Sequence, residues 1–205
     1  GIVLTHGHED HIGAIPYLAD DIKVPIYGTA LTLGILDHKL AMRRADANMI
    51  TVEPGDKIKL GVFECEFIKV AHSMAGACAL AIDTPLGTVF FTGDFKIDST
   101  PIDGKLTDLQ RIAEIGAKGV LLMLGESTNV ERKGHSTSEK VVGRTLDTIF
   151  NNNRDRRITV ATFASSNYRV QQILDLAEKY GRKVILSGRS MKMIVEVAAS
   201  VGELK

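Results

Sequence analysis

The sequence has no tryptophan, only two cysteines and five prolines, and aromatic residues make up 5% of its 205 positions. Two cysteines are too few for a disulfide framework, so we expect a reducing, cytoplasmic setting. No run of about 18 apolar residues is present, which excludes a membrane-spanning helix. The N-terminus also lacks a basic region followed by a cleavable apolar stretch. There is no excess charge either, because 25 Lys and Arg balance 25 Asp and Glu, which argues against a globally basic nucleic-acid-binding protein.

What the chain does contain is typical of a soluble globular protein, with 44% hydrophobic and 24% charged residues. Its length suits one domain, or one domain with part of another. The chain opens directly on an apolar run, Ile2–Leu4, that is typical of a buried strand. Its last helix is followed by only a few residues. We therefore expect a segment of a longer protein.

Apolar runs alternate with amphipathic stretches along most of the chain. The middle has the pattern of hairpins, whereas the C-terminal third alternates helix and strand, which favours βαβ units and a parallel sheet. A capping box, Ser136 to Glu139, predicts the start of one helix. The expected strands are 2–5, 25–27, 57–60, 62–70, 78–82, 88–92, 120–124, 157–162 and 183–186, and the expected helices are 12–19, 29–44, 106–115, 136–150, 167–180 and 190–200.

Three of the six histidines fall within six residues, directly after the first strand. The segment reads His6-Gly7-His8-Glu9-Asp10-His11. Imidazole nitrogen and carboxylate oxygen are ligands of Zn²⁺ and similar cations. A loop leaving a strand can direct His6 and His8 to one ion while Asp10 and His11 turn to a second. A single histidine would be read as a surface or core residue, but this spacing predicts metal binding.

Two further residues follow apolar strands in the same way. His72 comes after the strand 62–70 and Asp94 after the strand 88–92, so both are expected at the edge where the first cluster lies. Asp94, with two carboxylate oxygens, is the natural bridge between two ions. Two divalent cations a few ångströms apart activate water and stabilise charge on an attacked centre. Hydrolysis is therefore the predicted class of reaction.

These residues resemble the metallo-β-lactamase superfamily. His6, His8, Asp10 and His11 match its HxHxDH motif, His72 its downstream histidine and Asp94 its bridging aspartate. The resemblance implies a partial αββα fold of the α/β class (an α+β sandwich) over residues 1–134, without the family's first strands and its C-terminal return. It also implies two divalent metal ions, Zn²⁺ first, with Mn²⁺ or Mg²⁺ as alternatives.

The later part of the chain is similar to the β-CASP segments of the ribonuclease J group. Leu124 to Asn129 resembles the acidic motif that opens this insertion, which implies a catalytic role for Glu126 beside Asp10 and Asp94. The segments 161–167 and 188–191 resemble later parts of it. Residues 135–205 are then the first part of a β-CASP α/β domain. The implied activity is 5′ exonuclease and endonuclease cleavage of RNA, and relatives of this group assemble as homo-oligomers.

The family's later β-CASP histidines have no counterpart in this sequence. His38 lies in a predicted helix and His135 precedes one, so both are expected at the surface. One set of ligands is nearly complete, namely His6, His8, His72 and Asp94, whereas the second has only Asp10, His11 and Asp94. We expect the chain alone to be a poor nuclease.

Contacts to RNA are predicted at two strand-to-helix turns. Ser165 and Ser166 precede a helix whose N–H groups can face a phosphate, although helix capping alone also explains them. Arg189 follows Gly188 at a similar turn. The zero net charge hides an asymmetry that suits an RNA partner: residues 1–134 carry 13 basic and 18 acidic residues, a net −5, and residues 135–205 carry 12 and 7, a net +5.

Two other functions remain open at the level of sequence. One is a small-molecule hydrolase, such as a lactonase or thioesterase, on the same scaffold. The other is a non-catalytic chain that binds RNA or a partner protein. The β-CASP-like third speaks against the first, and the missing histidines keep the second in play.

Overall fold

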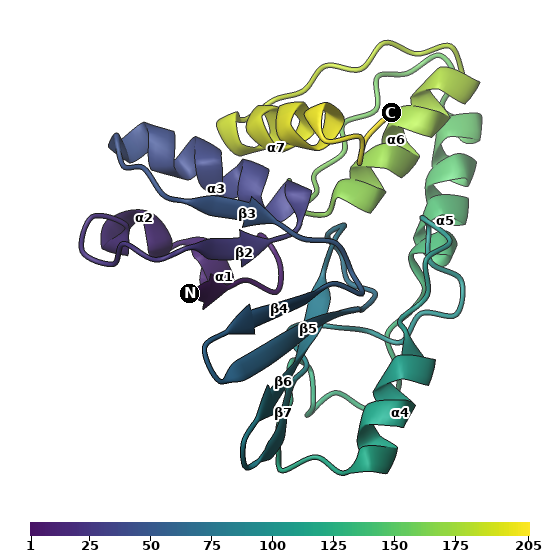
Figure 1. Ribbon diagram of the computed structural model, residues 1–205. Coiled ribbons are helices and arrows are strands. Elements are labelled where there is room, and N and C mark those ends of the chain that lie inside the picture. The colour runs from purple at the N-terminus through teal and green to yellow at the C-terminus, as the bar shows by residue number, and fades with distance from the viewer.

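Two β-sheets form the middle of the molecule, and the computed structural model, which describes residues 1–205, places helices on their outer sides (Figure 1). The strands are β1 (Ile2–Val3), β2 (Ile26–Gly28), β3 (Met49–Thr51), β4 (Lys57–Leu60), β5 (Phe63–Lys69), β6 (Cys78–Thr84), β7 (Gly87–Phe91) and β8 (Leu122–Leu124). The helices are α1 (Glu9–Ile12), α2 (Ile15–Leu18), α3 (Ala30–Arg43), α4 (Leu109–Lys118), α5 (Glu139–Asn152), α6 (Asn167–Lys179) and α7 (Arg189–Ser200).

The first sheet is parallel, in the order β1-β2-β3, with Ile2 opposite Ile26 and Ile26 opposite Met49. The second sheet has the order β4-β5-β6-β7-β8 and is antiparallel except for the parallel pair β7–β8. The hairpin expected across Pro85 and Leu86 is confirmed, since Thr84 pairs with Gly87.

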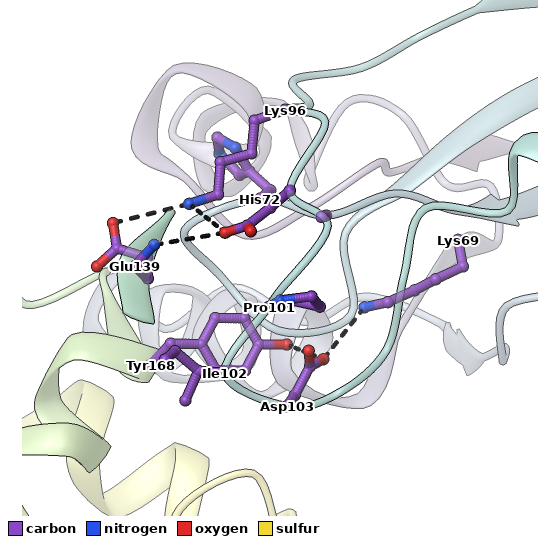
Figure 2. Close-up of a pocket in the computed structure, with 10 residues that line it drawn as sticks. Lys69, His72, Lys96, Pro101, Ile102, Asp103, Glu139 and Tyr168 are labelled. Carbon is purple, nitrogen blue, oxygen red and sulfur yellow. Dashed lines mark hydrogen bonds and ion pairs between the residues drawn. The ribbon is translucent and has the colours of Figure 1, made fainter. Parts of the chain in front are cut away.

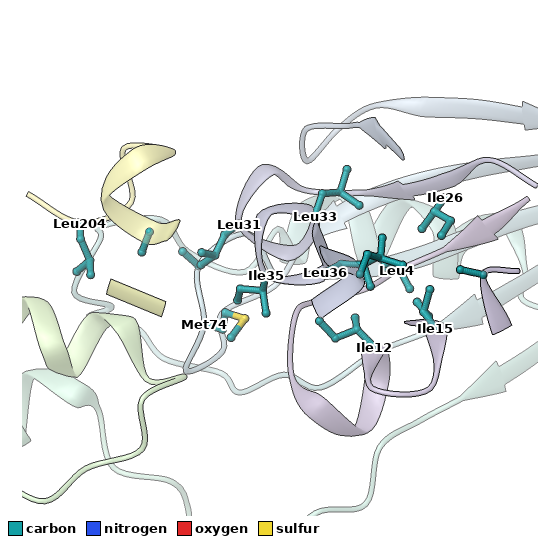
Figure 3. Close-up of a cluster of buried hydrophobic side chains, with 14 of the residues drawn as sticks. Leu4, Ile12, Ile15, Ile26, Leu31, Leu33, Ile35, Leu36, Met74 and Leu204 are labelled. Atoms are coloured by element: carbon teal, nitrogen blue, oxygen red, sulfur yellow. The ribbon is translucent and has the colours of Figure 1, made fainter. Parts of the chain in front are cut away.

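Alternating side chains divide the interior into layers. On one face of the second sheet, Ile68, Val70 and Phe90 pack against Ile115 of α4. The other face, which includes Phe67 and the buried thiols Cys65 and Cys78, packs against Val3 and Tyr27 of the first sheet. The far side of the first sheet is covered by α3, whose buried residues form the largest core with Leu4 and Ile26 (Figure 3). The layers therefore run helix, sheet, sheet, helix, which confirms the expected α/β sandwich.

The C-terminal helices share this largest core. Val170 of α6 and Ala198 of α7 belong to it, as does Leu204 (Figure 3). Helices α3 and α7 lie side by side and approach closely at Gly34, where an added Cβ would lie 2.7 Å from Val197 Cγ1. The boundary expected between residues 134 and 135 stays a prediction.

Several expected elements differ in the structure. Residues 157–162 and 183–186 form no strand, because neither apolar run pairs with a neighbouring backbone. Strand β3 was not expected. The helix α4 begins at Leu109 rather than at 106, since the Asp108 side chain accepts a hydrogen bond from Arg111 N and caps it. Helix α5 is likewise capped by Ser138, not Ser136. No helix combines the length and the apolar character needed to cross a bilayer.

We expect Leu36→Ala to lower the free energy of unfolding by about 2–5 kcal/mol, because Leu36 is fully buried in α3 and its loss leaves a cavity. Urea denaturation measures the change. Met42→Ala is the matched control, since Met42 lies in the same helix but is 74% exposed. It should change stability by less than about 0.5 kcal/mol. Equal losses in the two variants would contradict the assigned core.

Candidate metal centre

The first group of predicted ligands lies on the short connection from β1 into α1. His6 is fully buried, and a hydrogen bond of 3.1 Å joins its Nδ1 to Thr5 Oγ1. With Nδ1 as donor to Thr5, the Nε2 lone pair of His6 is free to point inward. The partner on one ring nitrogen sets which tautomer the other presents. Thr5 was not among the site residues predicted from the sequence, and its contact with His6 is seen only in the structure.

Three imidazole nitrogens meet at one point. His6 Nε2 lies 3.0 Å from His8 Nδ1, and His72 Nε2 lies 3.1 Å from the same atom. The rings of His6, His8 and His72 are edge-on to one another, with centroids 4.7–4.8 Å apart, so their nitrogens converge rather than stack. His72 reaches this point from the loop after β5, 64 residues further along the chain than His8.

Asp94 lies between this group and a second one. Its Oδ2 is 3.9 Å from His6 Nε2 and 4.0 Å from His72 Nε2, whereas its Oδ1 is 3.4 Å from His11 Nε2. Gly93 makes this turn possible: its φ is +55°, and an added Cβ would lie 2.9 Å from the Cys78 carbonyl oxygen. The two oxygens of one carboxylate thus face two different groups.

The second group is smaller and more exposed. Asp10 Oδ2 lies 3.6 Å from His11 Nε2, and Asp94 completes the set. In each group the donor atoms lie within 4.8 Å of one another; the groups are His6, His8, His72 with Asp94, and Asp10, His11 with Asp94. The structure therefore brings together all six residues that the sequence predicted as ligands.

Burial keeps the histidines of the first group neutral. Desolvation, followed by the neighbouring His11, His72 and His8, lowers the pKa of His6 to about 2. Desolvation also lowers the pKa of His72 to about 4 and lowers the pKa of His8, although Asp10 and Asp94 oppose the shift of His8. A neutral imidazole offers a lone pair, which is the form that binds a metal ion.

This donor set suits a divalent cation. At least one pair of these uncharged nitrogens has no proton between its members. The lone pairs of such nitrogens repel each other and the nearby carboxylate, and a cation that accepts the lone pairs removes this repulsion. The His8 Nε2 is buried and has no hydrogen-bond partner, so the ring's polar contact lies on the side of the converging nitrogens. Nitrogen and oxygen donors of this kind are those of zinc sites.

Glu126 lies beside the two groups. Its Oε2 accepts a hydrogen bond of 2.7 Å from Thr128 N, and its Oε1 accepts a longer one of 3.5 Å from Phe95 N. A cavity of about 370 Å³ is lined by Glu126 together with His72, Asp94, Lys96 and other residues, among them His135. His38 and His135 are exposed, as expected, but the place of His135 on this cavity was not predicted.

The residues predicted to contact RNA lie outside this cavity. Ser166 is buried as the residue before α6, and its side chain forms no capping hydrogen bond. Ser165 is partly buried, and Arg189 is exposed at the first position of α7. Their role stays a prediction. Glu9, at the variable position of the motif, is exposed and forms an ion pair with Lys39.

Comparison with known families gives two matches that together span most of the chain. Residues 1–149 match the family described as "Beta-lactamase superfamily domain". Residues 155–205 match "Ribonuclease J, beta-CASP domain".

Curated relatives match along the whole chain. Ribonuclease J of Thermus thermophilus is 44% identical over 99% of this chain, and ribonuclease J of Synechocystis is 48% identical over 100% of it. The chain spans about a third of their length, 37% and 32% respectively. A crystal structure of a protein of unknown function from Enterococcus faecalis has the same fold, with a TM-score of 0.69 and 24% identity over 96% of this chain and 48% of its own.

We expect the metal-free chain to lose stability as the pH falls from about 6.5 to 5. The unfolded chain takes up protons on His6 and His72 near pH 6.5, whereas the folded chain resists them because both pKa values are lowered. Stability is therefore fully present above pH 6.5 and is lost below it, by on the order of 2 kcal/mol per histidine at pH 5. Urea denaturation with a chelator present measures this slope.

The control for this slope is Met42→Ala, which replaces an exposed side chain, leaves every titratable group in place and should leave the pH dependence unchanged. His72→Gln should reduce the slope, because one of the three histidines whose pKa values are lowered is gone. A pH dependence that is the same in His72→Gln as in the wild type would contradict the assignment.

We further expect the chain to bind two divalent ions with separable determinants. Asp10→Asn should weaken one ion by more than about tenfold and leave the other in place, whereas His8→Ala should do the reverse. Asp94→Asn should weaken both, since its oxygens face both groups. Calorimetric titration with Zn²⁺ gives the stoichiometry. Asp46→Asn, at an exposed position, is the control, and a single class of site affected equally by all variants would refute the arrangement.

Proposed function

The chain belongs to the β-lactamase superfamily and is similar to ribonuclease J along its whole length, and from this premise we propose that it hydrolyses RNA phosphodiester bonds with two divalent cations. Zn²⁺ is the proposed cation, with Mn²⁺ or Mg²⁺ as alternatives. The observation that carries the proposal is the pair of ligand groups that share Asp94, on a chain whose C-terminal segment matches the β-CASP family of ribonuclease J.

The two groups of residues have separate proposed roles. His6, His8 and His72 bind through neutral nitrogens, and Asp10 and His11 form the second group. Cations held by these residues would lower the pKa of water and neutralise charge on the attacked phosphate. Asp94 holds the two groups in a fixed relation, because each of its oxygens faces one of them.

Glu126 is the proposed acidic assistant at the scissile phosphate. Backbone N–H groups of Phe95 and Thr128 hold its carboxylate at the cavity that His72 and Asp94 also line. Ser165, Ser166 and Arg189 are proposed to contact the RNA further along its path. The net charge of +5 over residues 135–205 supports an anionic partner on that side.

We propose slow turnover for the 205-residue chain itself. The second ligand group has three members where the first has four, and the chain spans only about a third of the length of the curated relatives. A cytoplasmic setting and assembly into homo-oligomers by the full-length enzyme are part of the same proposal.

Cleavage under single-turnover conditions tests the proposal. The chain, in excess over a 5′-monophosphorylated RNA, is incubated with Zn²⁺ or Mn²⁺ and compared with Asp94→Asn. We expect slow, metal-dependent cleavage that falls by at least about 100-fold in the variant, because both groups lose a shared ligand. Asp46→Asn should cleave at the wild-type rate.

Other outcomes identify the alternatives. Hydrolysis confined to a thioester or lactone would make the chain a small-molecule hydrolase. RNA binding that is equal in the wild type and Asp94→Asn, with no cleavage by either, would make it a non-catalytic binder. Fast multiple turnover would contradict the proposed weakness of the chain alone.

A further inference from the structure

The first turn of α6 contacts the segments that carry two of the proposed ligands. We call residues 70–77, between β5 and β6, the His72 loop, and residues 92–98, after β7, the Asp94 loop. Three consecutive residues, Asn167, Tyr168 and Arg169, each reach one of these loops or the residues that hold it. All three lie at least 69 positions further along the chain than the Asp94 loop, so nothing in the local sequence links them to it.

Asn167 holds the His72 loop directly. Its Oδ1 accepts a hydrogen bond of 2.9 Å from Ala75 N, and both residues are fully buried. Ala75 lies in irregular backbone, so its N–H needs a partner from elsewhere, and a buried N–H without one costs about 1–3 kcal/mol. The Nδ2 of Asn167 has no partner, so this one bond is the polar contribution of the side chain.

Tyr168 acts at the start of the same loop. Its hydroxyl donates a hydrogen bond of 2.7 Å to Asp103 Oδ2, which also lies 3.9 Å from the Lys69 ammonium (Figure 2). Lys69 is the last residue of β5, three positions before His72. Burial, and then the bond to Asp103, raise the pKa of Tyr168, so the hydroxyl keeps its proton and remains a donor.

Arg169 acts on the Asp94 loop through Glu139. Its guanidinium donates to both carboxylate oxygens of Glu139, at 2.8 and 3.0 Å. Glu139 pairs with the Lys96 ammonium at 3.7 Å, and its N–H donates to the buried Asp98 (Figure 2). Lys96 N donates in turn to the Ala71 carbonyl oxygen at 2.8 Å, which joins the two loops.

We infer that the first turn of α6 positions the His72 and Asp94 loops, and so the metal ligands they carry, with Asn167 as the principal positioning residue. The inference rests on the proposed metal-dependent function. Mutation of a residue that holds a metal ligand in place typically lowers metal affinity or activity by 10- to 100-fold. On this reading α6 couples the C-terminal segment to the metal centre.

Asn167→Leu tests the inference in the full chain, because leucine has a similar volume and cannot accept the Ala75 N–H. We expect faster hydrogen exchange of the Ala75 amide and an affinity for Zn²⁺ that is about 10- to 100-fold weaker, measured by competition with a chelator. Tyr168→Phe removes one oxygen and keeps the shape, so it tests the same turn even if Asn167→Leu fails to fold. It should weaken Zn²⁺ binding at least about threefold, since Asp103 loses its hydrogen bond from Tyr168 and is left with Lys69 alone at the start of the His72 loop.

Gln172→Leu is the matched control. Gln172 is a buried amide of the same helix whose Nε2 has no partner, and its Oε1 lies against Gly143 of α5 rather than either loop. Its loss should change global stability and leave Zn²⁺ affinity within about twofold of the wild type, because it touches neither loop. Equal weakening in Gln172→Leu, or wild-type affinity in both α6 variants, would overturn the inference. If the wild-type chain bound none of Zn²⁺, Mn²⁺ and Mg²⁺, the proposed function would fail, whereas unchanged exchange at Ala75 would reject the positioning role by itself.

Discussion

The exclusion of protons from a cluster of imidazoles is the constraint on which the rest of this structure depends. His6, His8 and His72 place their nitrogens about 3 Å apart in a partly dry environment, so their pKa values fall and none is readily charged. The fold excludes water from this cluster. Two sheets packed face to face bring the ends of β1, β5 and β7 to one edge, where three loops from distant parts of the sequence meet. The close approach of these imidazoles lowers the stability of the fold but gives a geometry that suits a cation, which is the usual relation between a functional site and its scaffold.

Much of this edge could be predicted because its signals are local. The spacing of His6, His8, Asp10 and His11, and the positions of His72 and Asp94 just beyond apolar strands, predicted that these six side chains meet at one edge of the sheets, and the structure brings them together there. Long amphipathic elements such as α5 were likewise clear from their periodicity. The strands predicted at 157–162 and 183–186 were wrong. Residue propensity indicates that a segment can form a strand, but the strand also needs a neighbouring strand to pair with, and the segment's own sequence does not reveal one. The starts of α4 and α5 were misplaced by about three residues for a similar reason: Ser136, Ser138 and Asp108 all have side chains that can cap a helix, and the folded structure uses Asp108 and Ser138.

The residues that support the ligands were the least predictable part of the site. Thr5 touches a ligand one position away, yet a threonine at a strand end carries no distinctive pattern. Asn167 accepts a hydrogen bond from a backbone amide 92 positions earlier, although its sequence context predicted only a helix start. Such contacts depend on how α6 docks, and docking is set by the shared core of α3, α6 and α7 rather than by any motif. Candidate ligands can thus be proposed from one sequence, whereas the contacts that hold them in place are visible only in the folded chain.

The two buried thiols between the sheets have a different consequence. Burial raises the pKa of Cys65 to about 11 and that of Cys78 to about 12, and both are less than 3% exposed. Thiolate is the reactive form, so neither sulfur can react with a labelling reagent until the layer between the sheets opens. Cys78 begins the strand that follows the His72 loop. The rate at which these thiols become reactive therefore measures how often the layer between the two sheets opens, and it can be measured without any change to the metal centre.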